Sequence, residues 1–315
     1  MATVPVLLLI ALFLTVSVVV ALITWRYPRP TIETAREVGK TVRRHPRLRA
    51  LLAARLDPET ATGLALTVAM IVAITGGVLF AVLAYLIRTN AHLLGIDNGV
   101  AKWGNRHGTA TSTHVLNDVT QLGSIYVVVG LCVVLAVTET FRQKTVWVSL
   151  FILFVMGGEE ILTLSVKQLA DRVRPTFNPV AATLGPSFPS GHSATAAAFY
   201  ATAALLIGRW RPRLARAVIA GLAAGIAVGV AATRVLLDVH WLTDVIAGLS
   251  LGWAWFAVCA IAFGGRILRF GAAARTAARV AGGPGVTRTP PKALSLSERS
   301  NTLKTVIPET RRTSR

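Results

Sequence analysis

The sequence predicts an all-α, polytopic membrane helix bundle. Composition is the first reason: apolar residues make up 53% of the 315 residues, and the mean hydropathy is +0.60. Charged residues make up only 15%, whereas soluble proteins contain about a quarter. A series of long apolar runs is a further reason. The alternating ten-residue segments of a membrane β-barrel are not visible.

Each predicted span is an apolar run that approaches the ~20 residues needed to cross ~30 Å of hydrocarbon as a helix. Seven runs do so, at about 4–25, 64–87, 123–139, 146–166, 191–208, 217–233 and 242–263. The polar stretch 140–145 is so short that it predicts a tight helical hairpin. Helices are required because backbone groups in lipid must satisfy their own hydrogen bonds.

The distribution of basic residues predicts the orientation in the membrane. The chain has 33 Lys and Arg against 14 Asp and Glu, and 26 of the 33 fall in segments that alternating spans place on one side: 26–62, 140–145, 209–216 and 264–315. Basic loops remain in the cytoplasm. We therefore expect a plasma-membrane protein with its N-terminus outside and its tail inside.

This topology divides the chain into an anchor and basic loop (1–62), a helical core (63–263) and a basic tail (264–315). Residues 4–25 could instead be a signal peptide, but no basic residue precedes the apolar core, as one does in a signal peptide. The tail from about residue 282 has no helical period, which predicts disorder. So apolar a chain leaves little basic surface for nucleic acid. Its two cysteines lie in apolar runs, which excludes a disulfide scaffold.

A group of charged and imidazole side chains is predicted at the outer ends of the spans, against the general charge bias. It consists of Lys167, Arg174, His192, Arg234, His240 and Asp244. Cations gathered at one place need an anion, and phosphate suits them well.

The spacing within this group has chemical content. Ser190 is a suitable N-cap for the span that follows, and Gly191 allows a ligand to approach the backbone amides of its first turn. His240 and Asp244 are four residues apart, which on a helix places them on one face. A carboxylate that accepts from one imidazole nitrogen leaves the other nitrogen free as a nucleophile.

Three segments carry a family resemblance: Lys167-x6-Arg174-Pro175, Pro189-Ser190-Gly191-His192, and Thr233-Arg234-x5-His240-x3-Asp244. In order and spacing they resemble the three-part signature of the type 2 phosphatidic acid phosphatase (PAP2) superfamily. The resemblance covers the six helices from about 64 to 263, and it implies a six-helix PAP2-like core preceded by one extra N-terminal transmembrane helix. One departure is Thr233, where the family usually has Ser.

The resemblance implies a role for each residue of the signature. His240 would attack phosphorus to form a phosphohistidine, Asp244 would orient it, and His192 would protonate the leaving alkoxide. The phosphate oxygens would be held by Lys167, Arg174, Ser190, Gly191 and Arg234. Family members are metal-independent, which implies that no cofactor is needed, and the sequence has no HExxH motif or Cys cluster.

Several residues beside the signature remain open. Glu160 shares a helix face with Lys167, and it either supports the cations or packs against another helix. Asp171 and Arg172 are interpreted as a solvated loop pair. The histidines of the outer 88–122 loop (His92, His107 and His114) are interpreted as surface groups, and the glycines of the sixth span (Gly221, Gly225 and Gly229) as a helix-packing face.

The predicted function is hydrolysis of a membrane lipid phosphate or polyprenyl diphosphate at the outer membrane face. A non-hydrolytic lipid-phosphate binding or transport protein on the same scaffold is the alternative from another class. A vanadium haloperoxidase has a similar site, but those proteins are soluble, and seven apolar spans argue against it. The sequence does not indicate an oligomeric state.

Overall fold

The computed structural model describes residues 4–26, 62–143, 145–178 and 185–267, all within one compact unit, Met1–Arg269. These residues form helices and connecting loops, with no strand among them. Most of the predicted basic loop and all of the predicted disordered tail lie outside the described residues.

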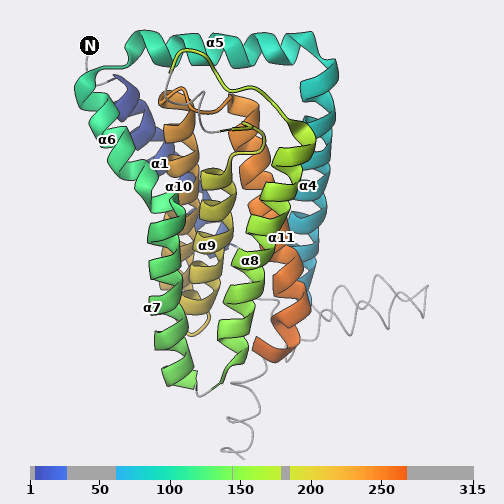
Figure 1. Ribbon diagram of the computed structural model, residues 1–315. Helices are drawn as coiled ribbons and strands as arrows, with labels where there is room; N and C mark the ends of the chain where they lie inside the picture. Colours follow the sequence, from blue (N-terminus) through green and yellow to red (C-terminus); the bar gives the residue numbers. More distant parts are fainter. Residues whose placement is uncertain (1–3, 27–61, 144, 179–184, 268–315) are drawn as a thin grey trace, which may run out of the picture. The chain divides into compact units, whose positions relative to one another are not determined.

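Long helices run along the length of a bundle, as Figure 1 shows. They are α1 (Val4–Arg26), α4 (Thr62–Thr89), α7 (Ile125–Gln143), α8 (Trp147–Ala170), α9 (Gly191–Gly208), α10 (Arg213–Leu236) and α11 (Leu242–Ile267). The predicted all-α bundle with an additional N-terminal helix is confirmed. Each helix overlaps one of the seven apolar runs.

Six of these helices are long and apolar enough to cross a membrane, and α9 is not among them. The difference from the seven predicted spans has a physical reason. Residues such as Ser193, Thr195, Tyr200 and Thr202 are buried against neighbouring helices, so α9 needs no lipid-facing apolar surface. Its 18 residues still give a length of about 27 Å.

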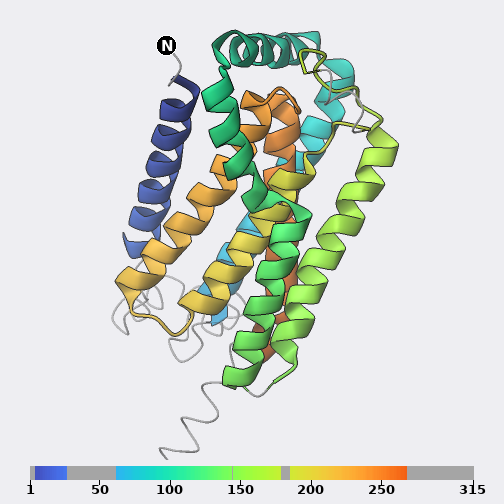
Figure 2. The same cartoon turned by 60° about the vertical axis from the view of Figure 1, so that its left-hand side comes forward.

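The predicted outer loop 88–122 is largely helical, which corrects the sequence interpretation. It contains α5 (Ala91–His107), α6 (Ala110–Thr120) and the short 3₁₀ helix η1 (Gln121–Gly123). Asn90 caps α5 by accepting from the Leu93 amide at 3.0 Å, and Thr109 begins α6 in a capping box with Ser112. Helix α5 lies across one end of the bundle (Figures 1 and 2).

Small residues allow two pairs of helices to pack closely. A side chain at Gly221 or Gly225 of α10 would clash with α1 at Ser17, and one at Gly248 or Gly252 of α11 would clash with the backbone of α9. Two of the three predicted packing glycines therefore bring α1 against α10, and Figure 2 shows these helices side by side. The third, Gly229, has no close neighbour.

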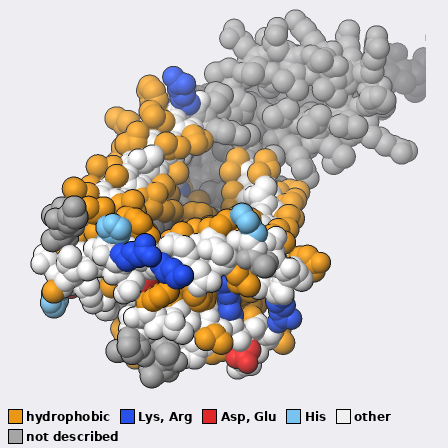
Figure 3. Space-filling model, turned by 90° about the horizontal axis from the view of Figure 1, so that it is seen from above, with side chains coloured by type: hydrophobic (Ala, Val, Ile, Leu, Met, Phe, Trp, Pro, Cys, Tyr) orange, Lys and Arg blue, Asp and Glu red, His pale blue; other side chains and the backbone are white. Residues whose placement is uncertain are grey.

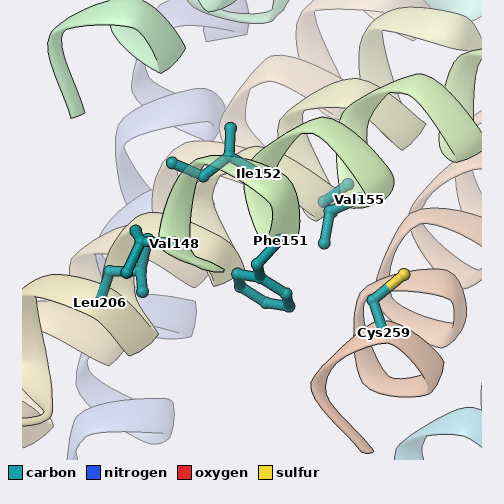
Figure 4. Close-up of a cluster of buried hydrophobic side chains, with 7 residues drawn as sticks. Val148, Phe151, Ile152, Val155, Leu206 and Cys259 are labelled. Atoms are coloured by element: carbon teal, nitrogen blue, oxygen red, sulfur yellow. The ribbon is translucent and has the colours of Figure 1, made fainter. Parts of the chain in front are cut away.

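A hydrophobic cluster holds α8, α9 and α11 together away from α5. Figure 4 shows its members Val148, Phe151, Ile152, Val155, Leu206 and Cys259. An ion cluster closes the same end of the bundle, where Glu139 accepts from Arg209 at 2.7 Å and from Arg142 at 3.4 Å. The helices are thus fixed at one end, while their other ends carry the signature residues.

Candidate active site

The signature residues lie where four helices begin or end beneath α5. Helix α8 ends at Ala170. Its C-cap residue, Asp171, takes a left-handed conformation (φ 41°), and the Asp171 amide donates to the Lys167 carbonyl. The loop between α10 and α11 turns through Asp238, also left-handed (φ 55°). Aspartate tolerates this conformation better than most residues do. The two turns direct the segments with Arg174 and His240 toward each other.

Arg174 joins the two loops. It is 7% exposed, and its guanidinium donates to the carbonyls of Gly185 (2.8 Å), Pro186 (3.3 Å) and Val239 (2.7 Å). Lys167 Nζ donates to the same Pro186 carbonyl at 3.0 Å. Both cations are thus held in place by neutral backbone oxygens.

Arg234 approaches from the last turn of α10. It is 9% exposed, its Nη1 donates to the Thr120 hydroxyl at 3.2 Å, and its buried Nε has no hydrogen-bond partner among the described residues. None of Lys167, Arg174 and Arg234 forms an ion pair with a carboxylate in the described part of the chain. Their positive charge is therefore available to an anion.

His240 is 3% exposed and its Nε2 lies 3.2 Å from Arg174 Nη1. Because a guanidinium can only donate, Nε2 must accept, and the neutral ring then carries its proton on Nδ1. Nδ1 lies 3.6 Å from Asp244 Oδ2. Burial lowers the pKa of His240 to about 4, more than the nearby Asp244 raises it. The imidazole is therefore neutral at physiological pH.

Asp244 is fully buried and held by several donors. Its Oδ1 accepts from Arg172 Nη1 at 2.6 Å, and its Oδ2 accepts from the Trp241 amide at 3.0 Å. Arg172 in turn donates to Asp97 of α5 at 2.7 Å, and Asp97 accepts from the amide and the hydroxyl of Thr243. This network fixes Asp244 at the side of the His240 ring.

The network corrects two sequence interpretations. Arg172 is not part of a solvated loop pair, because its side chain is 11% exposed and bonds two buried carboxylates. His240 and Asp244 do not share a helix face, since α11 begins at Leu242 and His240 lies before it. They meet because Asp244 caps the turn that leads from His240 into the helix.

The start of α9 agrees with the prediction in position but differs in detail. Ser190 is the N-cap residue, yet its hydroxyl accepts from Ser193 at 2.9 Å and caps no backbone amide. Its own amide donates to the Asp244 carbonyl at 3.0 Å, which ties α9 to α11. At Gly191, an added side chain would meet only Thr163, at 3.8 Å. The first amides of α9 thus have room for an anion.

His192 follows in the first turn of α9 and is half-buried. The charges of Arg234, Lys167 and Arg174 all act on it, as does His240. The structure therefore brings both histidines and the three cations of the signature together.

The two glutamates of α8 have different surroundings. Glu159 is fully buried and accepts from Thr163 at 2.7 Å and from Thr195 at 3.1 Å, which links α8 to α9. Glu160 is half-buried and acts electrostatically on Lys167. This interaction favours the first of its two interpretations, support of the cation cluster.

Sequence reasoning missed Asp97, Thr120 and Thr243. Asp97 lies on a helix that was interpreted as a loop, and only its position among the few acidic residues of the chain could have drawn attention to it. Arg172 was visible within the first motif, but its partners come from α5 and α11, 75 and 72 residues away. No local pattern connects them.

The surface over this end of the bundle is basic. Figure 3 shows Lys, Arg and His side chains spread over the face seen from above, with acidic side chains sparse. Within the described ranges, no group of three or more His, Cys, Asp or Glu side chains is placed to hold a metal ion.

Comparisons with known proteins agree with this geometry. A model of the PAP2 superfamily matches residues 148–267. The chain is 35% identical over 178 residues to phosphatidylglycerophosphatase B of Bacillus subtilis (strain 168), covering 55% of this chain and 85% of that protein. It is 36% identical over 122 residues to a lipid A 1-phosphatase of Rhizobium johnstonii, covering 36% of this chain and 46% of that protein.

A solved structure gives the same result. The crystal structure of a transmembrane PAP2-type phosphatidylglycerolphosphate phosphatase from Bacillus subtilis aligns with a TM-score of 0.58 at 32% identity, over 63% of this chain and 98% of that one. The bundle, the three motifs and these likenesses together show that this multi-pass membrane protein belongs to the PAP2 superfamily.

Proposed function

We propose that this protein is a phosphatase that hydrolyses a lipid phosphate monoester or diphosphate at the outer face of the membrane, without a metal. One observation supports this above the others. Lys167, Arg174 and Arg234 all act electrostatically on His192, Arg174 also contacts His240 Nε2, and none of the three cations forms an ion pair with a carboxylate of the described chain. Such a site stabilises an anion whose charge increases during the reaction.

In the first step, Nε2 of His240 attacks phosphorus while the bond from phosphorus to the lipid oxygen breaks. His192, which the bound phosphate anion keeps protonated, gives a proton to the departing alkoxide, and Asp244 stabilises the positive charge on the His240 imidazole through Nδ1–H. The products are the dephosphorylated lipid and a phosphohistidine. Asp97 and Arg172 take part indirectly, by holding Asp244 in place.

In the second step, a water molecule attacks the phosphohistidine and gives a proton to His192. The P–N bond breaks, inorganic phosphate leaves, and His240 is neutral again. Phosphoryl transfer requires mainly positioning and charge stabilisation. The three cations, with the amides of Gly191 and the first turn of α9, supply both.

Turnover measured in detergent over a panel of lipid phosphates, with EDTA present, tests this proposal. The panel comprises phosphatidylglycerophosphate, phosphatidate, lipid A 1-phosphate and a polyprenyl diphosphate. The relatives' names favour a phosphomonoester. We expect release of phosphate that EDTA leaves unchanged and that vanadate, a five-coordinate phosphate mimic, inhibits. Binding without release would support the non-hydrolytic alternative, and a strict Mg²⁺ requirement would contradict the proposed chemistry.

The orientation is a separate part of the proposal and rests on the distribution of basic residues. A cysteine at His114, which is exposed on α6, should react with an impermeant thiol reagent in intact cells. A cysteine at Ser295 in the tail should react only after the cells are permeabilised. The reverse pattern would place the site on the cytoplasmic face.

A further inference from the structure

An apolar pocket of about 540 Å³ lies beside the site, between α1, α5, α10 and α11. Every residue that lines it is apolar or glycine, among them Leu12 of α1, Gly99 and Trp103 of α5, Val235 of α10, and Val245 and Leu249 of α11. Its volume is in the range of ligand pockets. None of the signature residues lines it.

The pocket adjoins the ends of the helices that carry the signature. Val235 directly follows Arg234, and Val245 directly follows Asp244. The loop that connects these helix ends contains His240. A molecule with a charged head at Arg234 and an apolar body against Val235 and Val245 would therefore occupy two adjacent spaces.

We propose that this pocket holds the hydrocarbon tail of the lipid phosphate, which makes α1 part of the substrate site. The inference rests on the proposed function. The apolar lining indicates the occupant. A peptide would leave backbone polar groups unsatisfied there, and water would find a single hydrogen-bonding side chain, the indole of Trp103, where a buried water needs about three partners. A hydrocarbon chain has no polar groups and therefore needs no hydrogen-bond partners in the pocket.

Helix α1 is fixed firmly enough to form a wall of the pocket. Gly221 and Gly225 of α10 admit the α1 backbone and Ser17 at close range. Leu12 and Leu8, which line the pocket, lie about one and a half and two and a half turns from Ser17 toward the N-terminus of α1. The structure from Bacillus subtilis is matched over 98% of its length by 63% of this chain. More than a third of this chain thus has no counterpart in that structure.

Such a pocket would select among lipid tails and orient the phosphate group. A tail that leaves the bilayer gains little hydrophobic free energy, because lipid is as apolar as leucine. Packing against a shaped wall can still discriminate between tails and can turn the phosphate toward His240. We therefore expect moderate effects on KM for long-tailed substrates and little effect on the phosphate chemistry.

Two glycines of α5 provide a matched test. Both Gly99 and Gly95 have open space where a side chain would begin, they are one helical turn apart, and only Gly99 lines the pocket. Gly99→Phe should raise KM for a long-chain phosphatidate about tenfold and leave kcat/KM for a dihexanoyl phosphatidate unchanged. Gly95→Phe should change neither. Equal effects of the two variants, or equal losses on both substrates, would overturn the proposal.

Crosslinking to the wild-type protein gives a second measurement that needs no turnover. A phosphatidate with a diazirine near the end of its tail should label α1 around Leu8 and Leu12, and excess unlabelled long-chain phosphatidate should compete. Labelling of α1 that phosphatidylcholine displaces equally would show an ordinary bilayer lipid in the pocket and overturn the inference. Specific labelling without hydrolysis would retain the tail site and reject the proposed function.

Discussion

The two ends of the helix bundle treat their cations differently. At the end away from α5, Glu139 accepts from both Arg209 and Arg142, so positive charge meets a carboxylate. At the end beneath α5, Arg172 is the one cation of the described residues that forms ion pairs with carboxylates, those of Asp97 and Asp244. Lys167, Arg174 and Arg234 donate to neutral oxygens. The first arrangement joins helices, and the second leaves charge for a ligand.

The largest expected effect is on the nucleophile. His240→Ala should abolish turnover, because it removes the imidazole whose Nε2 is proposed to attack phosphorus. Rapid quenching of the wild-type reaction with radiolabelled lipid phosphate should give a protein-bound phosphate that is acid-labile and base-stable. Full activity in His240→Ala would disprove the mechanism.

A comparison of one arginine from each end tests the difference directly. Arg234→Ala should lower kcat/KM on the order of 10²–10³-fold, by analogy with loss of one donor to a transition-state oxyanion. Arg209→Ala should instead lower the thermal midpoint, because it leaves Glu139 with a weaker set of partners. Activity per folded molecule of Arg209→Ala should be unchanged. Similar losses of kcat/KM in the two variants would contradict the assignment of a catalytic role to one end of the bundle and a structural role to the other.

Arg172 should show an intermediate effect, since it holds a catalytic group without touching the substrate. Arg172→Ala should lower kcat by about 10–100-fold, the range seen when partners of a ligating histidine are removed. KM should change little, in contrast to Arg234→Ala. Adding Asp97→Asn removes one of the two carboxylates left unpaired and should restore part of the thermal stability. A rise in KM with kcat unchanged would mean that Arg172 binds phosphate.

The smallest effect near neutral pH concerns protonation of His240. Its pKa is about 4, so the reactive neutral form is nearly complete above pH 5. Protonation removes the Nε2 lone pair, so kcat/KM should fall through a midpoint near pH 4 and about tenfold per pH unit below it. A pH profile in detergent measures this limb, with circular dichroism to confirm folding. A midpoint near 6.5 would indicate a solvated nucleophile.

The sequence predicts much of the bundle because long apolar runs and loop charges act locally. The positions of Lys167, Arg174, Arg234 and both histidines at one end also follow from their places at span termini. Asp97 could not be predicted in the same way, since its role depends on how α5 folds over the end of the bundle. The contact between His240 and Asp244 was expected for the wrong reason, because helical spacing resembles the spacing of a capped turn.

Helix α9 has a consequence for how the protein is made. An 18-residue segment that begins with Gly191-His192-Ser193 and contains several hydroxyl groups is a poor candidate to partition into lipid alone, since insertion depends on the apolarity of each segment. It must enter the membrane together with α8 and α10, whose surfaces bury its polar side chains. The segment that holds Ser190 and His192 thus depends on its neighbours during biogenesis, and a ribosome-bound chain that ends before α10 should fail to integrate α9.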